Sequence, residues 1–299
     1  PDVEAGRIDS PAKGVSAAEL VGGALSGSTA RLVAHDPGVR LGVDPEDVHQ
    51  ARVATRRIRA DLRTFRPLID AVWASDLRAE LRWLGGELGA VRDRDVLIGL
   101  TRDAAAVFLE TERHAAEHLI TVLEEERDSA RERLLDAMRG DRYVSLLDRL
   151  VEASNTPVFV PDATEANAAT LVALGARPWK RLRSEVRGLG DTPDDAALHR
   201  VRILTKRSRY AAEALVPVAG KSARSFAKAA ASLQDVLGRV QDASAAGAWV
   251  RSKTSRASSA ESFVAGMLAS AAAGWGRDAR DAWPAAWRRL KRKRVASWS

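Results

Sequence analysis

An internal repeat constrains the fold of this chain more than any other feature. Residues 48–65 read VHQARVATRRIRADLRTF, and residues 198–215, which lie 150 positions later, read LHRVRILTKRSRYAAEAL. Each copy is followed at a nearly equal distance by a second shared motif, LGAVRD at 88–93 and LGRVQD at 237–242. Because self-similarity at a fixed period reports repeated structural units, the sequence predicts two homologous halves, each with a helix rich in His and Arg.

The sequence around these motifs predicts an all-α protein, because it is rich in Ala, Leu, Arg and Glu and lacks the alternation of a strand. The first predicted helix ends before Asp36-Pro37-Gly38, and the second begins with Asp44 as N-cap and Pro45 in the first turn. The predicted helices cover about 16–34, 45–66, 74–88, 92–139 (one or two helices), 142–152, 164–186, 194–216, 221–239, 240–251, 261–274 and 277–294.

The predicted helices divide the chain into two halves. Residues 153–163, ASNTPVFVPDA, contain two Pro and no helical period, and we interpret them as the linker. The expected organisation is a flexible N-terminal segment at 1–14, a first helical half at 15–152, the linker at 153–163, a second helical half at 164–294 and a tail at 295–299.

A helical wheel separates each repeated helix into two adjacent stripes. The first stripe is suited to a core, with Val48, Ala51, Thr55, Ile58, Leu62 and Phe65 in one copy and Leu198, Val201, Thr205, Ser208, Ala212 and Leu215 in the other. The second stripe starts one residue later and is basic, with His49, Arg52, Arg56, Arg59 and Arg63, and then His199, Arg202, Lys206 and Arg209 before Glu213.

Basic side chains that border a core stripe lie at the edge of an interhelical groove. Like charges at i,i+4 repel by a few tenths of a kcal/mol per pair, so their repetition indicates an anionic ligand. Arg presents a planar fork that matches phosphate oxygens. The alternative is a charged flank that pairs with acids elsewhere, although residues 198–209 hold five Arg or Lys and no acid. Single-strand nucleic-acid sites interleave aromatics with cations, and these helices offer only Phe65 and Tyr210.

Composition agrees with an anionic partner. The 47 Lys and Arg against 40 Asp and Glu give a formal charge of +7, which favours nucleic acid, a phosphorylated polymer or an anionic membrane surface. The absence of Cys excludes disulfides and thiol chemistry. There is no uninterrupted apolar run of about 18 residues, so we expect no transmembrane segment. The chain begins with Pro rather than Met, and we expect that sequence precedes it.

The repeated motifs resemble those of the CHAD family, the histidine-named α-helical domains. The resemblance runs over about residues 16–292 and is carried by 44–68 (DPEDVHQARVATRRIRADLRTFRPL), 77–97 (LRAELRWLGGELGAVRDRDVL), 197–215 (ALHRVRILTKRSRYAAEAL) and 237–243 (LGRVQDA). It implies two pseudo-symmetric helical bundles around a basic central groove or pore, and a domain that binds inorganic polyphosphate rather than an enzyme. The ExExK motif of the CYTH domains that often precede CHAD domains is absent from the chain.

Residue by residue, the resemblance implies ligand contacts at His49, Arg52, Arg56, Arg59, His199, Arg202, Lys206 and Arg209, and Arg63 fits the same stripe. Arg57 and Arg207 match the motif, but the wheel turns them about 80–120° away. Arg92 belongs to the VRD motif, and the second copy has Gln241 in its place. Further basic candidates in the second half are Arg177, Lys180, Arg181 and Arg183, against Arg31 alone in the first.

Other candidate sites are weaker. His114, Glu117 and His118 match H-x-x-E-H, an inverted zinc-protease pattern that needs a third ligand, and a solvated helix flank is the favoured interpretation. Five of the eight Trp fall at 249, 275, 283, 287 and 298, where helix packing is favoured over a partner or membrane surface. The basic run at 288–294 is either solvated or a contact for DNA or lipid.

The sequence therefore predicts non-catalytic binding of inorganic polyphosphate, without cofactor or metal, in the cytoplasm or on polyphosphate granules. Two alternatives remain open at this point. One is a nucleic-acid or nucleoid-associated protein, and the other is a hydrolase that acts on a phosphate polymer.

Overall fold

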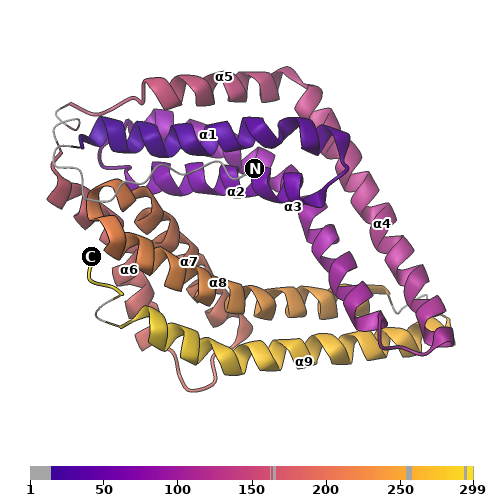
Figure 1. Ribbon diagram of the computed structural model, residues 1–299. Coiled ribbons are helices and arrows are strands. Elements are labelled where there is room, and N and C mark those ends of the chain that lie inside the picture. Colours follow the sequence, from indigo (N-terminus) through magenta and orange to yellow (C-terminus); the bar gives the residue numbers. More distant parts are fainter. Residues whose placement is uncertain (1–14, 162, 164–165, 254–257, 293–294, 299) are drawn as a thin grey trace.

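A computed structural model describes residues 15–161, 163, 166–253, 258–292 and 295–298, and in this part the chain forms helices and no named strand (Figure 1). The predicted all-α fold is therefore confirmed. The helices are α1 (Ala17–Leu41), α2 (Pro45–Thr64), α3 (Ala71–Ala105), α4 (Glu110–Arg139), α5 (Asp141–Asn155), α6 (Ala168–Arg187), α7 (Asp195–Ala214), α8 (Val216–Lys253) and α9 (Ser259–Leu290).

The repeated segments form α2 and α7, which have the same length of 20 residues. Both begin with an Asp N-cap: Asp44 accepts a hydrogen bond from the Glu46 amide, and Asp194 accepts one from the Ala197 amide. All twelve residues of the two predicted core stripes are buried, with exposed fractions of 6% or less. The basic stripe of each helix consequently borders the core, as the wheel predicted.

Helix α1 is longer than predicted, because it continues through Pro37 and ends at Leu41. Proline removes one amide donor from the helix, and contacts of the neighbouring Asp36 hold this part of α1 in place. Asp36 forms an ion pair with Arg40 at 2.7 Å and accepts a hydrogen bond from the Tyr143 hydroxyl at 2.5 Å. The helix ends where Gly42 takes φ 71°, a left-handed conformation that favours glycine.

Three predicted helix breaks are absent. Helix α3 runs through Gly85, Gly86 and Gly89, and the break falls at 106–109 instead. Helix α8 passes 239–240 and has its kink at Gly220, with φ 59° and ψ −138°. Helix α9 runs without a break from the first predicted C-terminal helix into the second, contains Pro284 and ends at Leu290 rather than at about 294. Glycine lowers helix propensity by about 1 kcal/mol, and continuous burial along each helix overrides that preference.

The predicted linker at 153–163 lies within the described residues except for residue 162. Its first three residues belong to α5, and α6 begins at Ala168 rather than at 164. The Asp70 amide donates to the Val158 carbonyl at 2.8 Å, and the Val160 amide donates to the Leu68 carbonyl at 3.1 Å. This short antiparallel contact fixes the linker against the segment that follows α2.

Helices α1–α5 form an N-terminal half and α6–α9 a C-terminal half, and the two halves meet in two places (Figure 1). Helices α2 and α7 contact each other within the main core. At the other end, α3 and α4 contact α8 and α9 through smaller apolar clusters that include Phe108, Leu119, Trp249, Val264 and Trp275.

The late Trp residues pack against the apolar clusters of the protein, which confirms the favoured interpretation. Trp249 and Trp275 cover the smaller clusters, and Trp283 and Trp287 pack against the main core. Trp298 is 5% exposed and contacts the Phe226 ring at a centroid distance of 5.2 Å, so part of the predicted tail belongs to the core. The predicted flexible segment 1–14, residues 293–294 of the basic run and residue 299 lie outside the described residues.

Candidate anion-binding site

The basic stripes of α2 and α7 meet where the two halves touch. Arg52 and Arg56 of α2 lie close to Arg202 and Lys206 of α7, and each of the three arginines helps to lower the pKa of Lys206. We call these four residues the central cluster. They come from equivalent positions of the two repeated segments, since Arg52 and Arg202, like Arg56 and Lys206, stand 150 positions apart.

Burial makes the central cluster costly in the absence of a ligand. Burial is the main cause that lowers the pKa of Arg56, of Arg202 and of Lys206, the last to about 7. The Nε–H groups of Arg56 and Arg202 are buried, and among the described residues they have no hydrogen-bond partner. An unpaired buried donor costs about 1–3 kcal/mol, so an anion at this position would satisfy donors that the protein leaves unpaired.

Two acids partly balance the cluster. Asp93 forms an ion pair with Arg52 at 2.9 Å, and Asp242 lies near Arg202 and Lys206. Burial raises the pKa of Asp242, although both cations oppose that rise. These two acids end the repeated VRD and VQD motifs. The cluster therefore keeps more basic than acidic groups at the junction.

The two predicted histidines have different surroundings. Burial and the neighbouring Arg92 lower the pKa of His49. His199 is exposed, and its Nδ1 atom lies 2.6 Å from Oε1 of Gln241. Because an amide oxygen only accepts, His199 donates through Nδ1 and leaves Nε2 for another partner. The difference between Arg92 and Gln241 thus makes the two halves unequal, as the sequence indicated.

The α2 stripe continues into a group of arginines that the sequence analysis missed in part. Arg59 lies near Arg63 and near Arg78 and Arg82 of α3. Burial is the main cause that lowers the pKa of Arg59, and these three arginines lower it further. Arg78 and Arg82 each follow a buried leucine by one position, Leu77 and Leu81. The rule that identified the α2 stripe would therefore have identified them too.

A cavity of about 440 Å³ lies beyond this group, between the C-terminal part of α2 and helices α6 and α7. We call it the second cavity. Its charged lining residues are all arginines: Arg63, Arg66, Arg177, Arg181 and Arg207. Two of the remaining candidates, Lys180 and Arg183, are exposed and do not line it, and the Arg183 guanidinium lies 5.9 Å from the centre of the Trp179 ring.

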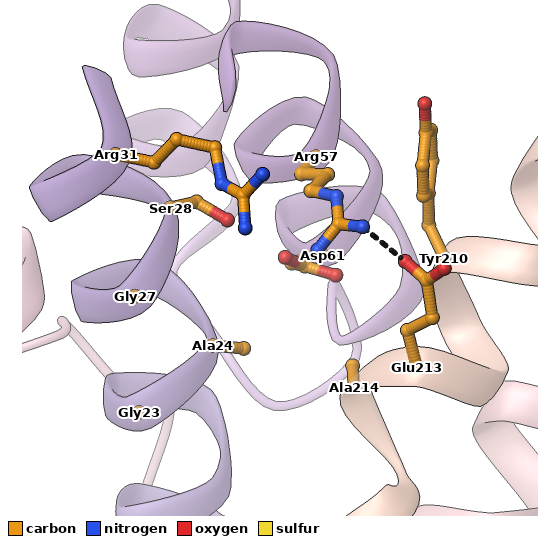
Figure 2. A pocket seen from close by; sticks show the side chains of 10 residues that line it. All are labelled: Gly23, Ala24, Gly27, Ser28, Arg31, Arg57, Asp61, Tyr210, Glu213 and Ala214. Carbon is orange, nitrogen blue, oxygen red and sulfur yellow. Dashed lines mark ion pairs between the residues drawn. The ribbon is translucent and has the colours of Figure 1, made fainter. Parts of the chain in front are cut away.

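A smaller cavity of about 230 Å³, the first cavity, lies between α1, α2 and α7 (Figure 2). Figure 2 shows Arg57 beside the buried carboxyl of Asp61 and linked to Glu213, from which the nitrogen Nη2 is 2.9 Å away. Glu213 also pairs with Arg209 at 2.7 Å. Two basic candidates, Arg57 and Arg209, are therefore already paired. Burial raises the pKa of Asp61 to about 8, which the sequence did not predict.

The described residues contain no group of three or more His, Asp or Glu side chains positioned to hold a metal. His114 and His118 are exposed and lie near different acids, Glu117 at 3.8 Å and Glu261 at 3.1 Å. The interpretation of this motif as a solvated flank is confirmed. Within the same described part, no helix combines the length and the apolar character that crossing a bilayer requires.

Comparison with known proteins agrees with this architecture. A family model described as the CHAD domain matches residues 23–251. Two uncharacterized Mycobacterium tuberculosis proteins, from strains CDC 1551 and H37Rv, are each 32% identical over 234 residues, which cover 75% of this chain and 44% of theirs. The chain thus spans less than half the length of these curated relatives.

Two solved structures have the same fold. PptA from Streptomyces chartreusis superposes with a TM-score of 0.75 at 26% identity, over 92% of this chain and all of that one. The CHAD domain from the plant Ricinus communis gives a TM-score of 0.70 at 27% identity, over 95% and 97% of the two chains.

Proposed function

The chain belongs to the CHAD domain family, and from this premise we propose that it binds inorganic polyphosphate without catalysing a reaction on it. The central cluster is the binding site, and His49, Arg59 and His199 extend it along α2 and α7. The observation that carries this proposal is the meeting of four basic side chains from both halves, with buried Nε–H groups on Arg56 and Arg202 that have no hydrogen-bond partner within the described part of the chain.

The chemistry of the central cluster suits a linear polyanion. Hydrogen bonds between a cation and an anion contribute about 1.5–3 kcal/mol each, and arginines one turn apart on a helix are spaced by about 5.4 Å. A phosphate chain presents charge at every repeat and can engage several of these groups at once. Release of condensed counterions adds to the affinity and makes it depend on salt.

Nucleic acid is less well matched, because the aromatic rings of these helices are not accessible for base stacking. Phe65 is fully buried and Tyr210 is 5% exposed. The guanidinium carbons of Arg57 and Arg209 lie 5.7 and 5.9 Å from the centre of the Tyr210 ring. Sequence-tolerant readers of single strands gain about 1–3 kcal/mol per stacked base, a contribution that this surface lacks.

Charge reversal of the central cluster tests the assignment. A variant with Arg52, Arg56, Arg202 and Lys206 all replaced by Glu should lose long-chain polyphosphate binding by at least about 100-fold, since each lost contact costs about 1.5 kcal/mol or more. Calorimetric titration measures the affinity, and circular dichroism checks that helicity is retained. The control is reversal of the exposed pair Arg288 and Arg289, which lies outside the cluster. Undiminished affinity in the folded quadruple variant contradicts the assignment.

Two further assays separate the alternatives. If the site is built for bare phosphates, double-stranded and single-stranded DNA should displace bound polyphosphate poorly at equal phosphate concentration, and efficient displacement would favour a nucleic-acid-binding protein. Labelled polyphosphate incubated with the protein and divalent metal should keep its length, and shortening of the chain would favour a hydrolase.

We further propose a location in the cytoplasm and on polyphosphate granules, which a fluorescent fusion viewed with a granule stain would test.

A further inference from the structure

The first and second cavities occupy repeat-related positions in the two halves. Each is bounded by the first and second helices of one half and by the second helix of the other half. Their lining residues correspond at a constant offset of 150 positions: Arg31 with Arg181, and Arg57 with Arg207. The same offset relates Gly27 to Arg177 and Glu213 to Arg63. The two cavities therefore differ by substitution at matched positions.

These substitutions give the two cavities different electrostatic character. The first cavity has two cations and two acids in its lining, Arg31 and Arg57 against Asp61 and Glu213. The second cavity keeps both arginines as Arg181 and Arg207 and adds Arg63, Arg66 and Arg177. No acid is found among its described lining residues. At neutral pH the protonated Asp61 leaves the Glu213 carboxylate against two arginines in the first cavity, whereas the second cavity carries five positive charges and no carboxylate among its described lining residues.

The contacts across the halves differ in the same way. In the first cavity, Arg57 pairs with Glu213 across the α2–α7 junction at 2.9 Å, and Arg31 donates to Gln50 at 2.9 Å. The counterpart of the Arg57–Glu213 pair is Arg207 with Arg63, and both of these residues are cations. Burial lowers the pKa of Arg207, and the nearby Arg63 lowers it further. Within the described part of the chain, we find no ion pair or hydrogen bond from any of the five second-cavity guanidinium groups.

We propose that the second cavity is a separate oxyanion site, which binds a phosphate group and bridges α2, α6 and α7. The anion lies between Arg63 and Arg207, the counterparts of Glu213 and Arg57, and so joins the two halves where like charges otherwise repel. Planar arginine forks match tetrahedral phosphate oxygens in pairs. Leu174, Pro178 and Leu204 form the apolar part of the wall, which lowers the local dielectric constant and strengthens each contact.

The bound phosphate group is either the end of a polyphosphate chain or a short free anion such as pyrophosphate. Arg63 follows Arg56 by seven residues, or about 10 Å along α2, and Arg59 lies between them on the same stripe. A chain held in the central cluster could thus reach the second cavity with its terminal group. That long-chain source rests on the proposed function, whereas the binding of a short phosphate does not.

Matched variants test the second cavity. Arg177 and Arg181 are exposed, so the double variant Arg177→Gln/Arg181→Gln should fold normally. The control is Arg31→Gln, because Arg31 is the counterpart of Arg181 in the first cavity, where the Glu213 carboxylate already pairs with Arg57. Calorimetric titration with pyrophosphate should give at least a tenfold weaker affinity for the double variant than for the wild-type protein, and an unchanged affinity for Arg31→Gln. Equal pyrophosphate affinity in the wild-type protein and the double variant, or no binding by either, overturns the proposal.

A second pair of titrations separates this site from the central cluster. The variant Arg52→Gln/Arg202→Gln should lose long-chain polyphosphate affinity but keep its affinity for pyrophosphate. Displacement of pyrophosphate from the wild-type protein by long-chain polyphosphate would identify chain ends as the source, and lack of displacement would identify free short phosphates. If the wild-type protein binds pyrophosphate but no long chain, the proposed function fails and the second cavity stands.

Discussion

At the residue scale, Lys206 shows how burial changes the chemistry of a side chain. Its pKa falls to about 7 because burial disfavours the ammonium, and Arg202, Arg56 and Arg52 act in the same direction. Only Asp242 opposes them among the neighbours that perturb it. Near neutral pH a large fraction of the free protein therefore carries an uncharged Lys206, which reduces repulsion inside the central cluster.

This protonation state predicts proton uptake on binding. A polyanion raises the pKa of Lys206, so above pH 7 binding requires the uptake of a proton, and affinity falls as pH rises from about 7 towards the pKa of the bound state. Calorimetry at pH 8 in two buffers with different ionisation enthalpies measures the protons taken up. Lys206→Arg should bind polyphosphate with a flatter pH profile and with less proton uptake. Identical proton uptake by the wild-type protein and Lys206→Arg would show that another group is responsible.

At the element scale, the close approach of α2 and α3 depends on small residues in α3. A Cβ atom at Gly89 would lie 3.3 Å from Nη2 of Arg52, and one at Gly85 would lie 3.4 Å from Oγ1 of Thr55. Gly89 lets the Arg52 side chain lie against the α3 backbone and reach Asp93, and Gly85 leaves room for Thr55. The shared LG motif, at 88–89 and 237–238, thus has a steric role in the first half.

Gly89→Leu should displace Arg52 and weaken polyphosphate binding by about tenfold, which corresponds to the loss of one charge-assisted contact of about 1.4 kcal/mol. The matched control is Gly86→Leu, because a Cβ at Gly86 meets nothing within 4 Å and the residue is exposed. Both substitutions raise helix propensity by a similar amount. Titration of both variants provides the measurement, and equal affinities would exclude a steric role for Gly89.

At the scale of the whole molecule, the α2–α7 junction combines binding and stability. It holds the central cluster, the Arg57–Glu213 ion pair that joins the halves, and the buried Asp61 beside that pair. Burial and the neighbouring Glu213 raise the pKa of Asp61, and Arg57 lowers it without offsetting the rise. The carboxyl is therefore mostly protonated in the folded protein at neutral pH.

This protonation gives a defined pH dependence of stability. Asp61 has a folded pKa of about 8 against an ordinary value of 3.8, so its contribution to folding is fully present below about pH 4 and is lost progressively as pH rises to about 8. Each pKa unit of this difference corresponds to about 1.4 kcal/mol. Asp61→Asn should therefore melt at a higher temperature than the wild-type protein at pH 8, and the difference should shrink towards pH 4. Parallel melting profiles across this range would contradict the buried carboxyl, and the exposed Asp76→Asn serves as control.

The sequence by itself determined the helical class, the core stripe of α2 and α7, and the basic stripe beside it. These follow from a period of 3.6 residues, which is a local property of each segment. It also gave the constant offset that relates the two cavities. The same local rule applies to Arg78 and Arg82, because each follows a core leucine of α3 by one position.

Only the tertiary structure decided which basic side chains act together. Arg57 and Arg209 pair with Glu213, whereas Arg63, Arg177, Arg181 and Arg207 gather around one cavity from three helices. The uninterrupted courses of α3, α8 and α9 likewise depend on burial against remote segments. The physical reason is that partner choice and desolvation arise from residues distant in the sequence, and these determine whether a cation is paired, buried or left for a ligand.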